Sequence, residues 1–225
     1  MIRAVIFDMD GLLIDTEPEW QELERNFAEK MGIRITPDLQ RQTLGLRTIE
    51  MIRHWHRLKP WPDPDFINSE AKIEENMKNY YMTEAKLMKG ATQVLHFFRD
   101  HKIKMALASS SPMMLIDTFI DKFKLQDFFV VKHSAEFEEY GKPHPGVYIT
   151  TAKKLVVHPS LCLAFEDSFN GLLAAKSAMM KAVVVPDSYH FPDKRFAIAD
   201  LKIRSLTKFG EKEWSVLNKN SISKI

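Results

Sequence analysis

The sequence predicts an α/β protein with a doubly wound, Rossmann-like parallel sheet core and an inserted small, all-helical cap. Three observations lead to this prediction. Short apolar runs bounded by turns recur along the chain, as expected of strands that are buried on both faces. Stretches with apolar residues at helical spacing separate these runs, and such alternation is typical of a parallel sheet. Between residues 17 and 84 the alternation stops and only helical patterns remain.

The expected strands share an apolar character and a turn at their ends. The first, Ala4 to Phe7, stops at the sequence Asp-Met-Asp-Gly. Because every residue in such a run is apolar, both faces of the strand must be covered, which is the situation in a parallel sheet. The other expected strands are Ile103–Ala108, Phe128–Val131, Leu161–Phe165, Ala182–Val185 and the less apolar Asp200–Ile203.

Helical spacing of apolar residues marks the segments between these strands. The stripes are Val94, Leu95 and Phe98 before the second strand, Leu115, Phe119 and Phe123 after it, and Val147, Tyr148, Ala152 and Leu155 further along. Pro112 falls near the start of the middle helix, where proline is tolerated, and we expect Ser111 to cap that helix. The last eight residues, NKNSISKI, lack any such pattern and are expected to fray.

Residues 17–84 are expected to form the helical cap, inserted into a core made of residues 1–16 and 85–225. Three stripes predict helices here: Trp20, Leu23, Phe27 and Met31; Ile49, Ile52 and Trp55; and Ile73, Met77 and Tyr80, which follow Ser69. Gly32 can end the first helix, and Thr36 followed by Pro37 predicts a further helix start. The alternate prolines from Pro60 to Pro64 require a loop. The chain is expected to cross between core and cap at residues 15–18 and 87–90.

The composition excludes several functional classes. Of the 225 residues, 45% are hydrophobic and 28% are charged, which rules out wholesale disorder. The 32 basic and 30 acidic residues leave a net charge of +2, which does not favour nucleic acid or an anionic membrane as a partner. Asp8 and Asp10 interrupt the apolar N-terminus, and no run reaches the roughly 18 apolar residues of a membrane helix. With Cys162 as the single cysteine, a reducing, cytoplasmic location is expected.

Polar residues follow the expected strands at the edge where a parallel sheet binds its ligands. The first strand is followed by Asp8 and Asp10, and the strand ending at Ala108 is followed by three serines, of which Ser109 and Ser110 are candidate phosphate ligands. Another strand leads into Glu166 and Asp167, and Lys142 lies in the loop sequence GKPHP. These carboxylates, hydroxyls and one cation are expected to meet in a single crevice.

This set of groups indicates phosphate chemistry. Carboxylates that are crowded together repel one another unless a cation joins them. Oxygen ligands suit Mg²⁺, which takes one or two carboxylates together with waters and a substrate phosphate. Lysine and serine can hold the remaining phosphate oxygens, and an aspartate can itself attack phosphorus. A phosphate ester is therefore the expected substrate class.

The same residues resemble the four motifs of the haloacid dehalogenase-like hydrolase superfamily. Residues 8–16, DMDGLLIDT, resemble its first motif, Ser109 the second, Lys142 in GKPHPGVY the third, and Glu166-Asp167-Ser168 with Asn170-Gly171 the fourth. All four are present in order over most of the chain, and the helical insertion falls where this family carries a small cap. A narrower resemblance, to the bacterial hexitol phosphatases or 2-deoxyglucose-6-phosphatases, rests on segments such as TLGLR (43–47), ASSSP (108–112) and ADLKIRSL (199–206).

The resemblance implies a role for each matching residue. Asp8 would be the nucleophile and a Mg²⁺ ligand, and Asp10 the acid and base, with its backbone carbonyl on the metal. Ser109 and Lys142 would bind the phosphoryl oxygens, with the backbone at Ser110. Asp167 would ligate Mg²⁺ directly, and Glu166 either directly or through a water. On the cap, Trp20 and Arg47 fall where relatives place groups that contact the substrate.

The expected function is thus Mg²⁺-dependent hydrolysis of small sugar or sugar-alcohol phosphates through an aspartyl-phosphate, with no nucleic acid, membrane or obligate protein partner. A β-phosphoglucomutase-like enzyme is the nearest alternative, because it shares the motifs and the cap. A dehalogenase, which would need neither the second aspartate nor Mg²⁺, a receiver domain, which has no cap, and a non-catalytic module fit less well. His54 and His56 do not share a helix face, so we interpret them as packing or surface residues.

Overall fold

The computed structural model describes residues 1–219, and within them the chain forms a six-stranded sheet that is parallel throughout. The strands are β1 (Ala4–Phe7), β2 (Lys104–Ser109), β3 (Val131–Ser134), β4 (Cys162–Glu166), β5 (Lys181–Val184) and β6 (Leu201–Lys202). Their order in the sheet is β3-β2-β1-β4-β5-β6, so the chain winds outward in both directions from β1. This confirms the doubly wound α/β fold.

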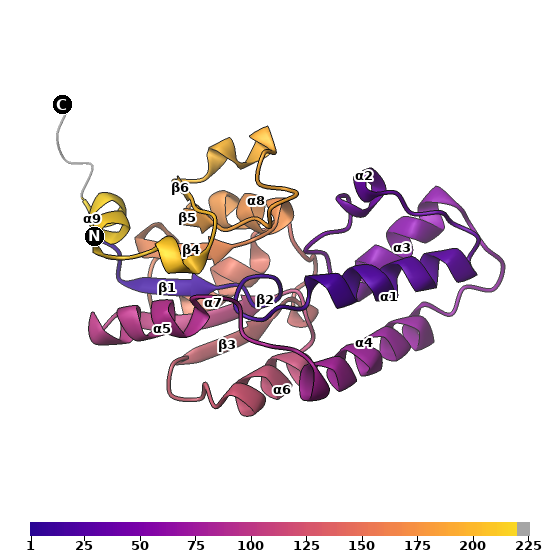
Figure 1. Ribbon diagram of the computed structural model, residues 1–225, viewed down its shortest axis with the longest axis horizontal. Helices are drawn as coiled ribbons and strands as arrows, with labels where there is room; N and C mark the ends of the chain where they lie inside the picture. Colours follow the sequence, from indigo (N-terminus) through magenta and orange to yellow (C-terminus); the bar gives the residue numbers. More distant parts are fainter. Residues whose placement is uncertain (220–225) are drawn as a thin grey trace.

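Helices cover both faces of the sheet (Figure 1). They are α5 (Ala91–Asp100), α6 (Met113–Phe123), α7 (Gly146–Leu155), α8 (Phe169–Ser177) and α9 (Glu211–Asn218), with short 3₁₀ turns η1 (Ala135–Phe137), η2 (Pro159–Leu161), η3 (Lys194–Ile198) and η4 (Leu206–Lys208). The first three coincide with the helices predicted from apolar spacing, whereas α8 and α9 were not predicted. Of the C-terminal segment expected to fray, residues 220–225 lie outside the described residues.

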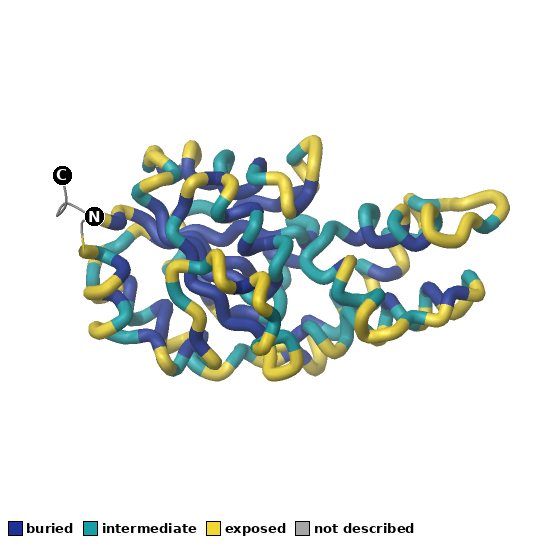
Figure 2. The backbone as a smooth tube through the Cα atoms, turned by 90° about the horizontal axis from the view of Figure 1, so that it is seen from above, coloured by how far each residue is buried: buried dark blue, intermediate teal, exposed yellow. Residues whose placement is uncertain are grey.

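Alternate residues of each strand enter two different apolar layers. In β1, Val5 and Phe7 face the layer that contains α5, α6 and α9, whereas Ala4 and Ile6 face the layer of α7 and α8. The first layer is rich in phenylalanine and leucine, and the second consists largely of alanine on the strand side. Small residues on that face bring α7 and α8 close to the sheet. Figure 2 shows the strands as the most continuously buried part of the molecule.

The helices of residues 17–84 gather beyond the carboxyl ends of the strands (Figure 1). They are α1 (Glu17–Lys30), α2 (Pro37–Gln40), α3 (Thr48–Leu58) and α4 (Phe66–Thr83), and they enclose an apolar cluster of their own around Trp55. The chain leaves and returns along adjacent segments, since Ile14 pairs with Leu87 and the amide of Asp15 donates to the carbonyl of Lys86 at 2.9 Å. The cap boundary at residues 17–84 stays a prediction.

Two details of the sequence interpretation were wrong. The third strand begins at Val131 rather than Phe128, because the rings of Phe128 and Phe129 pack against the apolar layer below the sheet and only the following residues pair with β2. Helix α4 starts at Phe66, capped by the Asp65 side chain, which accepts from the amide of Asn68 at 3.0 Å. Ser69 therefore lies inside the helix.

An aromatic cluster in the larger apolar layer predicts a strong effect on stability. Phe165 is fully buried, with ring centroids of Phe7 at 5.0 Å and Phe209 at 4.9 Å. Phe165→Ala should lower the free energy of unfolding by about 3–5 kcal/mol, because it leaves a cavity between these rings. Urea unfolding measures this loss. The same substitution at the 63%-exposed Phe137 is the control and should cost less than about 1 kcal/mol; equal losses would contradict the packing described here.

Candidate active site

The carboxyl ends of the central strands bring the predicted site residues together. Phe7 at the end of β1 is in register with Leu107 of β2 and Phe165 of β4, so the residues that follow these three meet at one edge. Asp8 follows β1, Ser109 ends β2, and Glu166 ends β4. The loop after η1 carries Lys142 into the same place.

Lys142 is the buried cation at the centre of this edge. Its side chain is 2% exposed, and Nζ lies 2.6 Å from Asp8 Oδ1 and 2.6 Å from Glu166 Oε1. Burial disfavours the charged ammonium, but the two carboxylates outweigh this effect and raise the pKa of Lys142 above its usual value. Lys142 therefore stays protonated and holds Asp8 in a fixed orientation.

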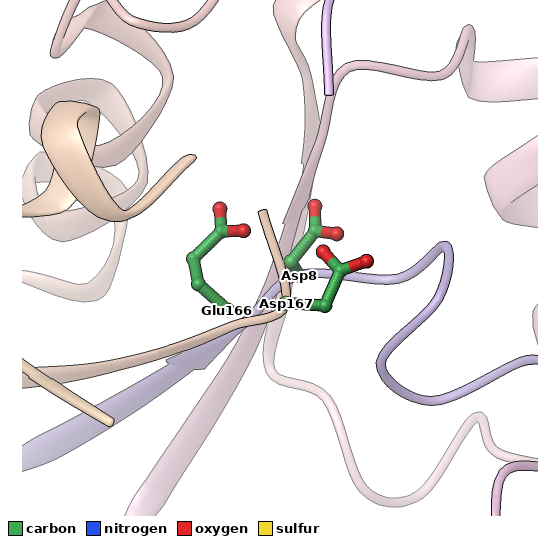
Figure 3. Close-up of side chains that lie close together, drawn as sticks. All are labelled: Asp8, Glu166 and Asp167. Carbon is green, nitrogen blue, oxygen red and sulfur yellow. The ribbon is translucent and has the colours of Figure 1, made fainter. Parts of the chain in front are cut away.

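Asp8, Glu166 and Asp167 form a compact carboxylate cluster (Figure 3). One oxygen from each lies within 4.8 Å of the others. Burial raises the pKa of Asp8 to about 8 although Lys142 pulls it down, and burial together with the charges of Asp8 and Glu166 also raises the pKa of Asp167. Three carboxylates facing one ammonium leave two negative charges uncompensated. An all-oxygen donor set with this charge fits a divalent hard cation such as Mg²⁺.

Within this cluster, Glu166 and Asp167 have different surroundings. Glu166 is completely buried, and its Oε1 accepts hydrogen bonds from Lys142 and from the hydroxyl of Tyr148. Asp167 packs against Gly11, where φ is +70° and a Cβ atom would lie 2.1 Å from Asp167 Oδ2. Glycine at residue 11 therefore allows the first and fourth motifs to approach each other.

Asp10 lies outside the carboxylate cluster, at the junction of core and cap. Its Oδ1 accepts from Thr16 Oγ1 at 2.7 Å, from Trp20 Nε1 at 3.0 Å and from the hydroxyl of Tyr81, and its Oδ2 accepts from Ser111 Oγ at 2.7 Å. Two of these donors, Trp20 and Tyr81, are on α1 and α4. Contacts from both sides thus fix the orientation of the Asp10 carboxylate.

The three serines after β2 make contacts that differ in part from the prediction. Ser109 is 1% exposed and lines the cavity described below, and its Oγ accepts from the amide of Ser111 at 3.0 Å. Ser110 Oγ donates to the carbonyl of Gly45 at 2.7 Å, which joins core to cap. The prediction that Ser111 caps the next helix was wrong, because its hydroxyl donates to Asp10 and α6 has no side-chain cap.

A cavity of about 690 Å³, including its mouth, lies between this edge and the helices of residues 17–84. Its core side is lined by Asp8, Asp10, Ser109, Ser110, Ser111, Lys142, Asp167 and Ser168. Its other side is lined by Glu17, Trp20, Gln21, Glu24, Thr43, Leu44, Gly45, Leu46, Thr48 and Met51. One end of the cavity therefore suits phosphate and metal, and the other is rich in hydrogen-bond acceptors.

The two cap residues singled out by the resemblance have different surroundings. Trp20 lines the cavity and donates its indole N–H to Asp10. Arg47 does not line this cavity; its Nη1 donates to the carbonyls of Ala135 at 3.1 Å and Glu138 at 2.9 Å in the core. The structure thus brings together all the predicted core residues and Trp20, but not Arg47.

Sequence analysis missed several residues of the site. Glu17, Gln21 and Glu24 share one face of α1 with Trp20, at the spacing i, i+3, i+4 and i+7 that could have identified them. Burial raises the pKa of Glu17 to about 8 and also raises that of Glu24, which accepts from Trp55 Nε1 at 2.9 Å. The α4 stripe was assigned to Tyr80, but Tyr81 is the fully buried residue and contacts Asp10.

The two histidines of α3 lie among aromatic rings, as expected of packing residues. His54 stands edge-on to Trp55, with 4.9 Å between ring centroids, and His56 lies 4.6 Å from the ring of Trp61. His144, beside Lys142, accepts from the amide of Gly146 at 3.1 Å and does not line the cavity. Within residues 1–219, no helix has both the length and the apolarity to cross a membrane.

Comparison with known proteins agrees with this fold. A family model for haloacid dehalogenase-like hydrolases matches residues 2–178. The chain belongs to this family of hydrolases. It is an enzyme, and its curated relatives place it with the phosphoric monoester hydrolases.

Two of those relatives are named for phosphatase activity. Hexitol phosphatase B of Escherichia coli strain K12 is 36% identical over 217 residues, which cover 94% of this chain and 96% of that protein. A phosphorylated carbohydrates phosphatase of Thermotoga maritima is 33% identical over 182 residues, or 81% of this chain and 84% of the relative. The structure of a β-phosphoglucomutase from Clostridium difficile superposes with a TM-score of 0.82 at 22% identity, covering 96% of each chain, and so shows the fold alone.

The raised pKa values of Asp8 and Asp167 predict that protons compete with a divalent cation. A folded-state carboxyl pKa above the unfolded value stabilises the metal-free protein at low pH, and this contribution is lost as the pH rises through about 8. The gain in Tm on adding the same fixed concentration of MgCl₂ should therefore be larger near pH 8.5 than near pH 6, because protons raise the apparent Kd at the lower pH. At 100 times Kd the added stability is about 2.7 kcal/mol.

Differential scanning fluorimetry at both pH values measures this effect. Asp167→Asn is the matched variant and should lose most of the Mg²⁺-dependent gain. A gain in Tm that is independent of pH, or is unchanged in Asp167→Asn, would contradict the assignment of the cation to this cluster.

Proposed function

We propose that the protein is a Mg²⁺-dependent phosphatase that hydrolyses monophosphates of small, neutral sugars or sugar alcohols through an aspartyl-phosphate intermediate. The observation that carries this proposal is the buried pair of Asp8 and Lys142, which lies beside uncompensated carboxylates at the floor of an enclosed cavity. The relatives named for hexitol and phosphorylated-carbohydrate phosphatase activity support the substrate class.

The proposed reaction assigns the covalent step to Asp8. Its carboxylate attacks phosphorus, a bond from the aspartate oxygen to phosphorus forms, and the bond from phosphorus to the sugar oxygen breaks. Asp10 donates a proton to the departing alkoxide. A water then attacks phosphorus while Asp10 accepts its proton, so the aspartyl-phosphate bond breaks and inorganic phosphate leaves. Lys142 and Ser109, with the backbone at Ser110, would hold the phosphoryl oxygens.

The contacts of Asp10 suit its proposed role as acid and base. Four side-chain donors converge on its carboxylate in this arrangement: Trp20 and Tyr81 lie on helices of the cap, and Thr16 and Ser111 belong to the core. Proton transfer by a group held in place in this way contributes typically 10²–10⁴-fold to a rate.

The residues present fit the implied metal. Asp8 and Asp167, with Glu166 directly or through a water and the backbone carbonyl of Asp10, would hold Mg²⁺. When bound, the ion would neutralise negative charge on the phosphoryl group and on the cluster.

The cap side of the cavity favours a neutral, hydroxyl-rich substrate. Among the residues that line it, Glu17 and Gln21 offer oxygen acceptors, the oxygens of Glu24 accept from Thr43, Trp55 and Gln40, and no lysine, arginine or histidine contributes from this side. Hydroxyl groups can donate to such acceptors, whereas a second phosphate would face carboxylates without a cation. A phosphosugar mutase must hold a bisphosphate at both ends, so this observation favours hydrolysis over the mutase alternative.

Asp8→Asn should abolish turnover, because it removes the attacking anion and a metal ligand while it preserves the shape of the side chain. Release of inorganic phosphate from a hexitol phosphate should fall to background, and thermal melting should still show a folded protein. Asp100→Asn, at an exposed carboxylate at the end of α5, is the control and should keep full activity. More than a few per cent residual activity in Asp8→Asn would rule out the covalent mechanism.

The acidic residues on the cap side of the cavity should make the enzyme discriminate between substrates by their charge. At pH 9, where Glu17 with its raised pKa of about 8 is ionised, two unit charges about 8 Å apart at an effective dielectric constant of about 20 repel by about 2 kcal/mol, a factor of roughly 30 in kcat/KM. A hexose bisphosphate should therefore react at least about tenfold less efficiently than the corresponding monophosphate. Glu17→Gln should narrow this ratio by raising relative activity on the bisphosphate; an unchanged ratio would remove Glu17 from substrate selection.

A further inference from the structure

A group of hydrogen bonds outside the cavity joins the start of α3 to the core segment 135–141. Arg47 Nη1 donates to the carbonyls of Ala135 and Glu138, and Nη2 donates to the carbonyl of Glu139 at 3.4 Å. The same Nη2 lies 2.6 Å from Glu50 Oε1, one turn along α3. One guanidinium thus bonds three backbone carbonyls of this core segment and an acid of its own helix.

Glu50 completes the connection from the other side. Its Oε1 accepts from the amide of Gly141 at 2.9 Å, and its Oε2 accepts from the amide of Arg47 at 3.4 Å. The side chains of Arg47 and Glu50 are only 14% and 25% exposed. A half-buried charged pair that also bonds several backbone groups is stronger and more specific than an exposed surface ion pair, although Arg47 Nε has no hydrogen-bond partner.

Gly141 allows the two surfaces to meet. A Cβ atom at this residue would lie 2.2 Å from Glu50 Oε2 and 2.9 Å from Arg47 Nε, so both side chains would have to move away from their present contacts. Gly141 directly precedes Lys142, whose ammonium is bound to Asp8. The contacts of Arg47 and Glu50 therefore end one residue away from the lysine at the centre of the site.

The loop that precedes Arg47 makes two further hydrogen bonds to core residues near the site. The carbonyl of Leu44 accepts from Asn170 Nδ2 at 2.8 Å, next to the fourth motif, and the carbonyl of Gly45 accepts from Ser110. Arg41 also joins the cap to the core, because it donates to the hydroxyl of Tyr189 at 3.3 Å, but Arg47 and Glu50 are the charged residues that reach the segment before Lys142. The loop that follows β3 would otherwise have no side-chain contact of this kind with the cap among the described residues.

We propose that Arg47 and Glu50 form a latch that holds the cap on the core and fixes the segment leading into Lys142. This inference rests on the proposed function, because it assigns these residues to the closed, reacting state. Arg47 and Glu50 are positioning residues that act through Lys142 and do not contact the sugar. Their loss should therefore affect every phosphate ester alike, whatever its leaving group.

The first test compares a hexitol phosphate with p-nitrophenyl phosphate. Arg47→Ala and Glu50→Gln should each lower kcat/KM about 10- to 100-fold on both substrates, with similar factors for the two. Arg47→Lys should restore only part of the loss, because one ammonium cannot reproduce the planar set of donors. Arg53→Ala, at an exposed arginine on the same helix, is the control and should behave as wild type.

A second measurement does not depend on turnover. Small-angle X-ray scattering should show a larger radius of gyration for Arg47→Ala than for wild type, and the affinity for inorganic phosphate in the presence of Mg²⁺ should fall about tenfold. Gly141→Ala should reproduce both changes by steric exclusion, which covers the case in which Arg47→Ala fails to fold.

The outcomes separate this inference from the proposed function. A loss confined to the hexitol phosphate would mean that Arg47 contacts the sugar, and unchanged scattering with unchanged phosphate affinity would mean that the latch does not hold the cap; either result overturns the proposal. If wild type released no phosphate from any ester, the proposed function would fail, whereas the scattering and phosphate-binding measurements would still decide the latch.

Discussion

The burial of Lys142 between Asp8 and Glu166 is the interaction on which the arrangement of the site depends. An ammonium group that is 2% exposed is stable only if carboxylates compensate for its lost hydration, and both partners lie at 2.6 Å. Because the two acids follow adjacent strands, β1 and β4, the lysine links the ends of the central strands. Since one ammonium cannot balance the ionised carboxylates of Asp8, Glu166 and the half-buried Asp167, the same arrangement creates the need for a second, divalent cation.

The two apolar layers differ in the size of their side chains, and this difference helps to position the residues at the carboxyl ends of the strands. The face that packs α5, α6 and α9 is filled with large rings, and the face under α7 and α8 is built from small residues. Close packing on the second face places the hydroxyl of Tyr148, on α7, against Glu166. The position of the Glu166 side chain therefore depends on the packing of α7 against the sheet as well as on the ion pair with Lys142.

Core and cap meet through two kinds of contact with different consequences. Asp10 is held inside the cavity by Thr16, Trp20 and Tyr81, so its orientation depends on where α1 and α4 lie. Outside the cavity, Arg47 and Glu50 hold the segment before Lys142. In the proposed enzyme, closure of the cap would therefore place the acid-base group and the phosphate-binding lysine together, while Glu17 and Glu24 would face the part of the substrate that carries no phosphate.

The sequence by itself determined the sheet, most of its helices and the core of the site. Runs such as Ala4–Phe7 are apolar on both faces, and the residues that follow parallel strands must meet at one edge, so Asp8, Ser109, Glu166 and Asp167 could be grouped without coordinates. Tertiary structure alone decided that Ser111 and Tyr81 bind Asp10, that Phe128 precedes its strand, and that Arg47 reaches the core rather than the cavity. These outcomes depend on which long-range partner lies within hydrogen-bonding or packing distance. Local spacing along the chain carries no information about such distances.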